Sequence, residues 1–257
     1  MSKVIVITGA SSGIGAALAK LLGSQGHALA LAARREALLK QAAAASGPEA
    51  IPVVTDVTRR AEVDNLRDVA LRRFGRVDVW VNNAGRGITR KVLELSDDDL
   101  DQMMAINLKS ALYGMQSIMP HFISRGEGHL INVSSMLGRV PFVSARSAYN
   151  AAKHALNALT ANLRVEVRDH PGIKVSLVMP GVVHTEFIAH AAGDKPVIAA
   201  GSLPGQTAEE VAQAMADLIE HPVAEIYTNP ALKQTVQEYF ADVGAFEERA
   251  AQRQRAR

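Results

Sequence analysis

The sequence predicts an α/β fold, in which helices cover both faces of a mainly parallel, doubly wound sheet. Three observations point to it. Short β-branched and apolar runs alternate with helical patterns along the chain. The first run, residues 4–7, is apolar at every position, which is typical of a strand covered on both faces. A glycine-rich segment, residues 9–15, follows that run and leads into an amphipathic helical pattern.

Seven runs are expected to form strands: residues 4–7, 28–32, 51–54, 77–81, 130–133, 173–178 and 224–227. The first should be central. The third contains Pro52, which cannot donate a hydrogen bond to a neighbouring strand, so this run should form an edge strand. The strand order 3-2-1-4-5-6 places it there.

Two apolar patterns predict helices, because their residues recur at the spacing of one helix face. Ser96 before three aspartates, and Thr207 with Glu210, are typical of helix N-termini. The two patterns are Ile14, Ala17, Leu18, Leu21 and Leu22, and Ala152, Leu156, Leu159, Leu163 and Val167.

Length and composition predict one domain, residues 1–257, with a large core of small apolar side chains. The formal net charge is only +2, and no basic stripe carries interleaved aromatics, which argues against a nucleic-acid partner. The absence of cysteine fits a reducing compartment. No apolar stretch approaches the ~18 residues of a membrane helix or resembles a signal peptide. We therefore expect a cytoplasmic protein.

The segment Thr8-Gly9-Ala10-Ser11-Ser12-Gly13-Ile14-Gly15 predicts a dinucleotide site. Glycines let the backbone turn sharply and approach a pyrophosphate, whose charge meets free N–H groups at a helix N-terminus. Alone, such a pattern could equally be a tight turn. The preceding strand and the following helix favour cofactor binding.

This segment, with its Gly-x-x-x-Gly-x-Gly spacing, resembles the short-chain dehydrogenase/reductase family. Further matches follow in order up to residue 185, and together they indicate the ordinary single-domain branch of that family. They are Asn82-Asn83-Ala84-Gly85, Asn107, Ser134-Ser135, Tyr149-x-x-x-Lys153, and Pro180-Gly181 with Thr185. The resemblance implies a Rossmann-type, seven-stranded fold and reversible reduction of a carbonyl to an alcohol by a nicotinamide cofactor.

Arg34 and Arg35 stand after the second strand, where NAD-preferring relatives tend to carry an acidic residue. An arginine there can bind a 2′-phosphate, so NADP(H) is favoured over NAD(H), although both arginines could simply be exposed at a helix start. The resemblance implies a wider set of cofactor-binding residues. These are Gly9, Ser11, Ser12, Gly13, Ile14, Gly15, Arg34, Arg35, Asp56, Val57, Asn83, Ala84, Gly85, Tyr149, Lys153, Pro180, Gly181, Val183 and Thr185.

Tyr149 and Lys153 are four residues apart, so a helix would present both on one face. A free tyrosine has a pKa near ~10, and the lysine is expected to lower it so that the phenol can exchange a proton with the substrate oxygen. By resemblance, Ser135 orients that oxygen, Lys153 also holds a ribose hydroxyl, and Asn107 anchors a water in a proton relay. Ser135 precedes Tyr149 by one position more than usual, which predicts an enlarged loop around residues 141–146.

A substrate flap is expected around residues 182–206. Phe187, Ile188, Met136 and Phe142 indicate an apolar pocket, while Arg86, Arg139 or Arg146 could meet a carboxylate or phosphate, unless they point to solvent. The sequence leaves open whether the substrate is a 3-oxoacyl thioester or another ketone, steroid or aldehyde. The resemblance also implies a homotetramer or homodimer, packed through the helix from Leu108 and the helix carrying Tyr149.

Other functions fit less well. A non-catalytic NADP(H)-binding sensor or assembly module on the same fold is the alternative, but it predicts a damaged active site, and Asn107, Ser135, Tyr149 and Lys153 are all present. Ser135 lies on no Gly-x-Ser-x-Gly elbow, which argues against a serine hydrolase. Epimerases and dehydratases on this fold usually have a larger substrate lobe. The histidines show no metal-binding spacing, so no metal is expected.

Overall fold

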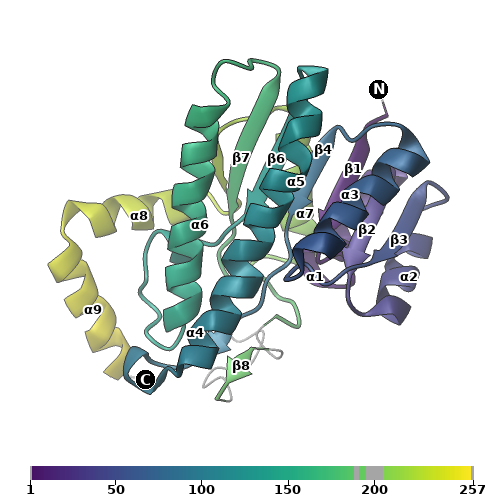
Figure 1. Cartoon of the computed structure of the whole chain (residues 1–257). Coiled ribbons are helices and arrows are strands. Elements are labelled where there is room, and N and C mark those ends of the chain that lie inside the picture. Colours follow the sequence, from purple (N-terminus) through teal and green to yellow (C-terminus); the bar gives the residue numbers. More distant parts are fainter. Residues whose placement is uncertain (1, 188–190, 195–204, 256–257) are drawn as a thin grey trace.

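A parallel seven-stranded sheet forms the middle layer of the protein (Figure 1). The structure is a computed structural model that describes residues 2–187, 191–194 and 205–255. The strand order confirms the doubly wound arrangement expected from the sequence. Across the sheet, the strands are β3 (Ala50–Val54), β2 (Ala28–Ala33), β1 (Val4–Thr8), β4 (Val79–Asn82), β6 (Gly128–Val133), β7 (Ile173–Met179) and β9 (Glu225–Tyr227).

β1 is an interior strand and β3 is an edge strand, as predicted. Every residue of β1 is buried, because helices cover both of its faces. Pro52 pairs with Leu31 of β2 on its inner side and is itself exposed. Its missing N–H group therefore leaves no neighbouring strand without a donor.

Helices cover both faces of the sheet (Figure 1). On one face lie α1 (Gly13–Ser24), α2 (Glu36–Ala45) and α7 (Ala208–Glu220); on the other lie α3 (Arg60–Phe74), α5 (Ser110–Arg125) and α6 (Ser147–Glu166). Alternate β1 side chains serve two separate cores, since Ile5 and Ile7 pack on the first face and Val4 and Val6 on the second. The sheet is thus fixed from both sides.

The two predicted helix starts are confirmed by capping boxes. The Ser96 hydroxyl accepts from the Asp99 N–H at 3.1 Å, at the start of α4 (Asp97–Met104). The Thr207 hydroxyl accepts from the Glu210 N–H at 3.1 Å, at the start of α7. Both helix starts are therefore determined by local sequence.

Short elements join the layers at the carboxyl ends of the strands. β5 (Ile88–Thr89) and β8 (Ala192–Gly193) form a two-stranded parallel sheet, and η1 (Val92–Glu94) and η3 (Met136–Gly138) are single 3₁₀ turns. The last two helices, α8 (Ala231–Ala241) and α9 (Val243–Arg255), form an arm at one side of the sheet (Figure 1). No helix within the described ranges is long and apolar enough to span a membrane.

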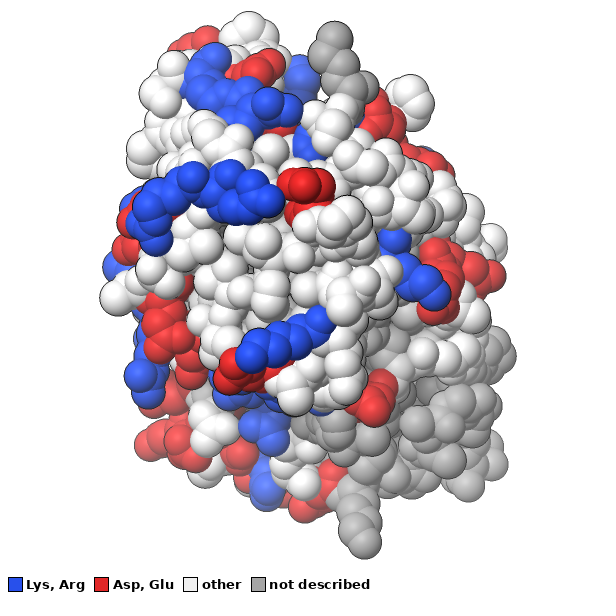
Figure 2. All heavy atoms as spheres, turned by 90° about the vertical axis from the view of Figure 1, so that its right-hand side faces the viewer, with Lys and Arg blue, Asp and Glu red and all other residues white. Residues whose placement is uncertain are grey.

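The molecular surface carries charges of both signs. Figure 2 shows the side on which β3 and α2 lie, where basic and acidic side chains are interspersed around a largely uncharged middle. Many of these charges pair locally, as Lys40 does with Glu36 at 2.7 Å within α2. Such exposed pairs contribute little to stability.

Candidate active site

The carboxyl ends of the strands bring the predicted site residues to one edge of the sheet. Gly9 follows β1, Asn83 follows β4 and Ser134 follows β6. Because all the strands are parallel, these positions emerge at the same edge, which is where open α/β sheets bind their ligands.

Tyr149 and Lys153 lie on one buried face of α6. Tyr149 is 7% exposed and Lys153 is 3% exposed. The Lys153 ammonium lies 5.7 Å from the centroid of the Tyr149 ring and donates to the Val133 carbonyl at 2.9 Å. The helix thus presents a phenol and an amine side by side, and the end of β6 anchors the amine.

The pKa values of this pair differ from the sequence-based expectation. Burial raises the pKa of Tyr149 to about 12, outweighing a hydrogen bond with Ser135 and the charge of Arg146, which both lower it. Burial lowers the pKa of Lys153 to about 8. The cation that lowers the Tyr149 pKa is therefore Arg146 rather than Lys153, whose amine lies over the ring and binds the Val133 carbonyl.

The two adjacent serines have different surroundings. The Ser134 hydroxyl donates to the Asn157 side-chain oxygen at 2.5 Å, which ties the end of β6 to α6. The Ser135 oxygen accepts from the Leu137 N–H at 3.1 Å, and Ser135 also hydrogen-bonds Tyr149. Ser135, the serine predicted to be catalytic, is thus the one beside the phenol.

Asn107 lies in η2 (Ala105–Lys109), a π-helical turn between α4 and α5. The Asn107 side chain donates to the Met103 carbonyl four residues earlier at 3.2 Å, which competes with the regular helix bonds. It also accepts from the Arg86 N–H at 3.1 Å and donates to the Arg86 carbonyl at 2.9 Å. Asn107 therefore holds the loop after β4 against the helix, and π turns often occur at functional sites.

The glycine loop packs closely against the loop after β4. Gly9 has φ +68°, and a Cβ at this position would lie 2.8 Å from the Ala84 Cα, so only glycine fits. The Thr8 hydroxyl accepts from the N–H groups of Asn83 at 3.0 Å and Ala84 at 3.1 Å. The Asn83 side chain donates to the Thr8 carbonyl at 2.9 Å. These contacts rigidify the loop. The hydrogen bonds of the Thr8 hydroxyl were not predicted from the sequence.

The start of α1 fits the pyrophosphate of a dinucleotide. The helix begins at Gly13, and its N-cap residue, Ser12, makes no side-chain capping bond. The first-turn N–H groups of a helix have no partners within the helix, and here the N-cap side chain does not supply one. Together with the positive helix end, they form a site for an anionic group.

Arg35 lies over the glycine loop. Its guanidinium donates to the Ser12 hydroxyl at 2.5 Å and to the Ser11 hydroxyl at 3.2 Å. Glu186, from the flap, lies 3.8 Å from the same guanidinium. The sequence shows no carboxylate directly after the second strand, but the tertiary structure brings this one to Arg35. Arg34 is exposed.

The described part of the flap touches both ends of the site. A Cβ built on Gly13 would lie 3.3 Å from the Thr185 methyl carbon, so Thr185 lies against the glycine loop. The Phe187 and Tyr149 rings meet edge to face, with centroids 5.7 Å apart. Val183 pairs with Gln206 at the base of the flap. Ile188, predicted for the pocket, lies outside the described residues.

Residues 3–195 match the family described as short chain dehydrogenase. This match spans the glycine loop, the serine pair and the tyrosine–lysine pair. The chain belongs to the short-chain dehydrogenase family. It is accordingly an oxidoreductase of this family, for which a pyridine nucleotide is the expected cofactor.

Relatives of this short-chain dehydrogenase include an uncharacterized oxidoreductase of Staphylococcus epidermidis, 36% identical over 71% of this chain and 79% of the relative. A short-chain dehydrogenase/reductase from Burkholderia phymatum, solved in complex with NAD, has a TM-score of 0.85 and 30% identity, covering 95% of each chain. An alcohol dehydrogenase from the archaeon Thermococcus sibiricus, complexed with 5-hydroxy-NADP, has a TM-score of 0.77 and 30% identity, covering 88% of this chain and 96% of that one.

Other predicted site residues of this short-chain dehydrogenase serve local structure. The Asp56 carboxylate accepts from the Thr58 hydroxyl at 2.7 Å, and Val57 is buried. The Pro180 carbonyl accepts from the Met136 N–H at 2.8 Å, while Gly181 lies against Leu232. These positions lie at the site edge of the sheet.

The three arginines proposed for substrate binding differ in their contacts. Arg139 donates to both carboxylate oxygens of Glu225 in β9, at 2.6 and 2.7 Å, and its charge is thereby paired within the protein. Arg86 follows the Asn83–Gly85 motif, and its backbone is held by Asn107. Arg146 lies beside Tyr149, whose pKa it lowers. Phe142, proposed as a pocket residue, is exposed.

Among the residues that the structure describes, no group of three or more histidine, aspartate or glutamate side chains could hold a metal ion. Polar groups near the phenol include Ser135, Lys153 and Arg146. This set suits proton transfer and anion binding.

Proposed function

We propose that the protein is an NADP(H)-dependent oxidoreductase that interconverts a carbonyl and a secondary alcohol, with Tyr149 as the acid/base. One observation carries the proposal: the Tyr149 phenol, buried on α6, meets Ser135 at the edge of the sheet where the glycine loop lies. A buried phenol beside a hydroxyl donor and a lysine can hold a proton until charge develops on a nearby oxygen.

The bound nicotinamide would supply or accept the hydride. The chain's own residues would handle the proton and the orientation of the substrate. Tyr149 is protonated at neutral pH, because burial raises its pKa to about 12, so it is ready to donate to the oxygen of a ketone. Ser135 can donate a second hydrogen bond to that oxygen, since its own oxygen accepts from Leu137. By resemblance to the family, Lys153 would also bind a ribose hydroxyl, and Asn107 would anchor a water of the proton relay.

Arg35 supports NADP(H) as the cofactor. Its guanidinium is held at the glycine loop by Ser11 and Ser12, where a 2′-phosphate could form charge-assisted bonds with it. Glu186 opposes this preference, because its carboxylate would compete with the phosphate for the same cation. The related structures include one complex with NAD and one with a modified NADP. The cofactor preference therefore depends on whether the Arg35 guanidinium binds the 2′-phosphate more strongly than it binds Glu186.

The proposal includes a homo-oligomer in the cytoplasm. Leu93 is fully exposed and Val92 is 70% exposed, both on η1. They lie beside residues 150, 151 and 154 of α6, one of the helices through which the family packs its subunits. Two large apolar side chains on a surface of this kind favour burial against a second copy.

The test is a turnover assay of wild-type protein and Tyr149→Phe with a panel of ketones, aldehydes and 3-oxoacyl thioesters. Each substrate is supplied with NADPH and with NADH, and loss of nicotinamide absorbance is followed. We expect faster turnover with NADPH, and a kcat lowered about 10²- to 10⁴-fold in Tyr149→Phe, because the variant cannot transfer the proton. The matched control is Tyr113→Phe, whose ring on α5 lies under Arg60 and away from the site.

The outcomes separate the candidate functions. A Tyr149→Phe variant as active as wild type would exclude this mechanism. Tight cofactor binding without turnover of any substrate would favour the non-catalytic NADP(H)-binding sensor instead. For an active enzyme, the reductive rate should fall as pH rises through the Lys153 pKa of about 8, because the ammonium that, by resemblance to the family, binds a ribose hydroxyl loses its charge.

A further inference from the structure

Arg146 is held at the N-terminus of α6 by a network around β5. The Arg90 N–H donates to the Ala145 carbonyl at 2.7 Å, and the Ser147 hydroxyl donates to the Arg90 carbonyl at 2.6 Å. The Arg146 guanidinium itself donates to the Ile88 carbonyl at 3.1 Å. Residues on both sides of Arg146, and its own head group, are thus fixed to the strand that pairs with the flap.

The guanidinium lies against the described part of the flap. Gly87 lets it approach closely, because a Cβ at that position would be 2.8 Å from Arg146 Nη1 and 3.0 Å from the Phe187 ring. Phe187 in turn meets the ring of Tyr149 edge to face. The cation therefore lies close to the phenol and to the described part of the flap, and the charge of Arg146 lowers the pKa of Tyr149.

Arg146 has no acidic partner among the residues that the structure describes. None of the ion pairs among the described residues involves it. The residues outside the described ranges include no aspartate or glutamate. A guanidinium has five N–H donors, and the Ile88 carbonyl takes only one of its bonds. This differs from Arg139 in the same region, which Glu225 neutralises.

Apolar side chains pack around the phenol that Arg146 faces. Tyr149 packs in a cluster with Ile88, Met103 and Ala148, and Phe187 lies against it. Burial lowers the pKa of Arg146, which reflects the cost of keeping a charge at this position. An anionic ligand would offset that cost and form charge-assisted, two-pronged bonds with the planar guanidinium. One guanidinium balances one negative charge, which matches a carboxylate better than a phosphate dianion.

We propose that Arg146 determines specificity by binding a carboxylate on the substrate, so that the protein reduces oxo acids to hydroxy acids in preference to neutral ketones. The inference rests on the proposed function for the reducible carbonyl. Tyr149 donates its proton to the carbonyl oxygen. Arg146, three residues earlier at the N-terminus of α6, binds the carboxylate, which the reaction does not change. The proton donor and the cation of the substrate site thus come from one helix terminus.

The first arm of the test measures binding without turnover. Hexanoate and hexanamide are titrated calorimetrically into the NADP⁺-loaded protein. We expect hexanoate to bind wild type about 10- to 100-fold more tightly than the amide. Arg146→Gln should lose this difference, because the glutamine amide can still bond to Ile88 but carries no charge. Arg146→Lys should keep part of it. Lys91→Ala, which removes an exposed cation close by, should keep all of it.

The second arm compares turnover of 2-oxo, 3-oxo and 4-oxo acids with that of their methyl esters. In Arg146→Gln, kcat/KM should fall about 10- to 100-fold more for the preferred acid than for its ester, mainly through KM, because the ester loses only the effect of the charge on the Tyr149 pKa. Equal losses of kcat/KM for acid and ester, or equal affinities of wild type for hexanoate and hexanamide, would overturn the assignment. A phosphate-bearing ketone with a higher kcat/KM than every oxo acid would overturn it as well. A hexanoate preference that depends on Arg146, with no turnover of any substrate, would instead contradict the proposed function.

Discussion

At the scale of single residues, two adjacent serines have different roles. Ser134 and Ser135 are adjacent, yet the extended backbone after β6 turns them toward different partners. Ser134 is buried against Asn157 of α6, and Ser135 meets Tyr149. A sequence motif identifies the pair, but only the direction of each side chain separates a structural hydroxyl from one that can touch the substrate.

This difference predicts opposite effects of two matched substitutions. Ser134→Ala should lower the free energy of unfolding by about 1–3 kcal/mol, because it leaves the buried Asn157 oxygen without its donor. Ser135→Ala should leave that free energy within about 0.5 kcal/mol and lower kcat at least tenfold. Urea unfolding and turnover assays on both variants check this. Similar losses of stability in the two variants would contradict the assignment.

At the scale of elements, the turn between β2 and α2 carries the position expected to select the cofactor. Arg35 is the N-cap residue of α2, and its side chain extends to the loop between β1 and α1. Two neighbouring βα turns are therefore linked by one guanidinium. The position of Arg35 at this turn was predicted from the sequence, but its contact with Glu186 was not. Glu186 lies about 150 residues further along the chain and comes near Arg35 only in the folded protein.

Removing this guanidinium should weaken NADPH binding more than NADH binding. In Arg35→Ala we expect the dissociation constant for NADPH to rise about 10- to 100-fold, since a charge-assisted contact with the 2′-phosphate is lost. The constant for NADH should change less than threefold. Fluorescence titration of both cofactors measures this, and Lys40→Ala, an exposed cation on α2, controls for net charge. An equal change in the dissociation constants of both cofactors would mean that Arg35 does not bind the 2′-phosphate.

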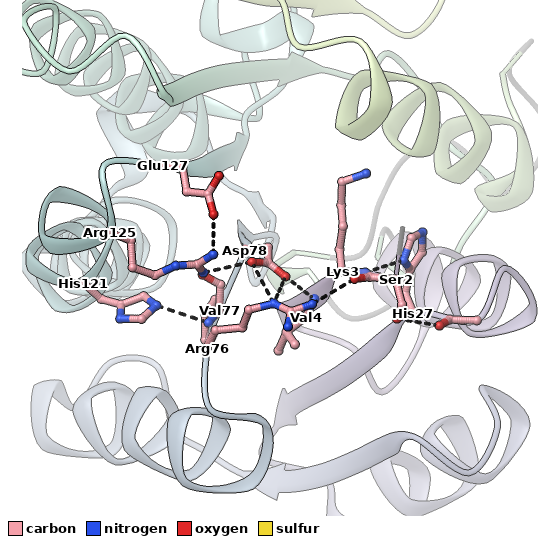
Figure 3. A network of polar contacts seen from close by, with 11 residues as sticks. Ser2, Lys3, Val4, His27, Arg76, Val77, Asp78, His121, Arg125 and Glu127 are labelled. Carbon is pink, nitrogen blue, oxygen red and sulfur yellow. Dashed lines mark hydrogen bonds and ion pairs between the residues drawn. The ribbon is translucent and has the colours of Figure 1, made fainter.

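At the scale of the whole molecule, a polar network connects several elements at the edge of the sheet opposite the active site (Figure 3). The Asp78 carboxylate accepts from the Val4 N–H at 2.7 Å, from Arg125 at 2.9 Å and from Arg76 at 2.9 Å. It therefore joins the beginnings of β1 and β4 to the end of α5. Burial raises the pKa of Asp78, but these hydrogen bonds lower it by more, so the net shift is downward.

Asp78→Asn should lower the free energy of unfolding by about 2 kcal/mol at pH 7, because Arg76 loses its anionic partner and Arg125 keeps only Glu127. Since the folded-state pKa lies below the unfolded value, the carboxylate stabilises the fold above about pH 4, and this contribution is lost as the pH falls through the folded pKa. The difference between wild type and variant should therefore narrow at pH 3.

Urea unfolding at both pH values tests this prediction. Asp169→Asn, which removes an exposed carboxylate near Arg168, should cost less than about 0.5 kcal/mol. Turnover at pH 7 should be unchanged in Asp78→Asn, because the network lies at the far edge of the sheet. A difference between wild type and Asp78→Asn that stays constant down to pH 3 would show that the carboxylate charge is not what stabilises this edge.

The sequence by itself determined the seven strands of the main sheet and two helix starts, because these depend on local periodicity and capping; the glycine segment after the first strand indicated the fold class and with it the strand order. Pro52 at the edge and the capping boxes at Ser96 and Thr207 are examples. Tertiary structure decided what depends on distant segments meeting: the π turn at Asn107, the Arg35–Glu186 contact and the place of Arg146 beside the phenol. Burial likewise set the pKa of Tyr149, since desolvation comes from packing as a whole.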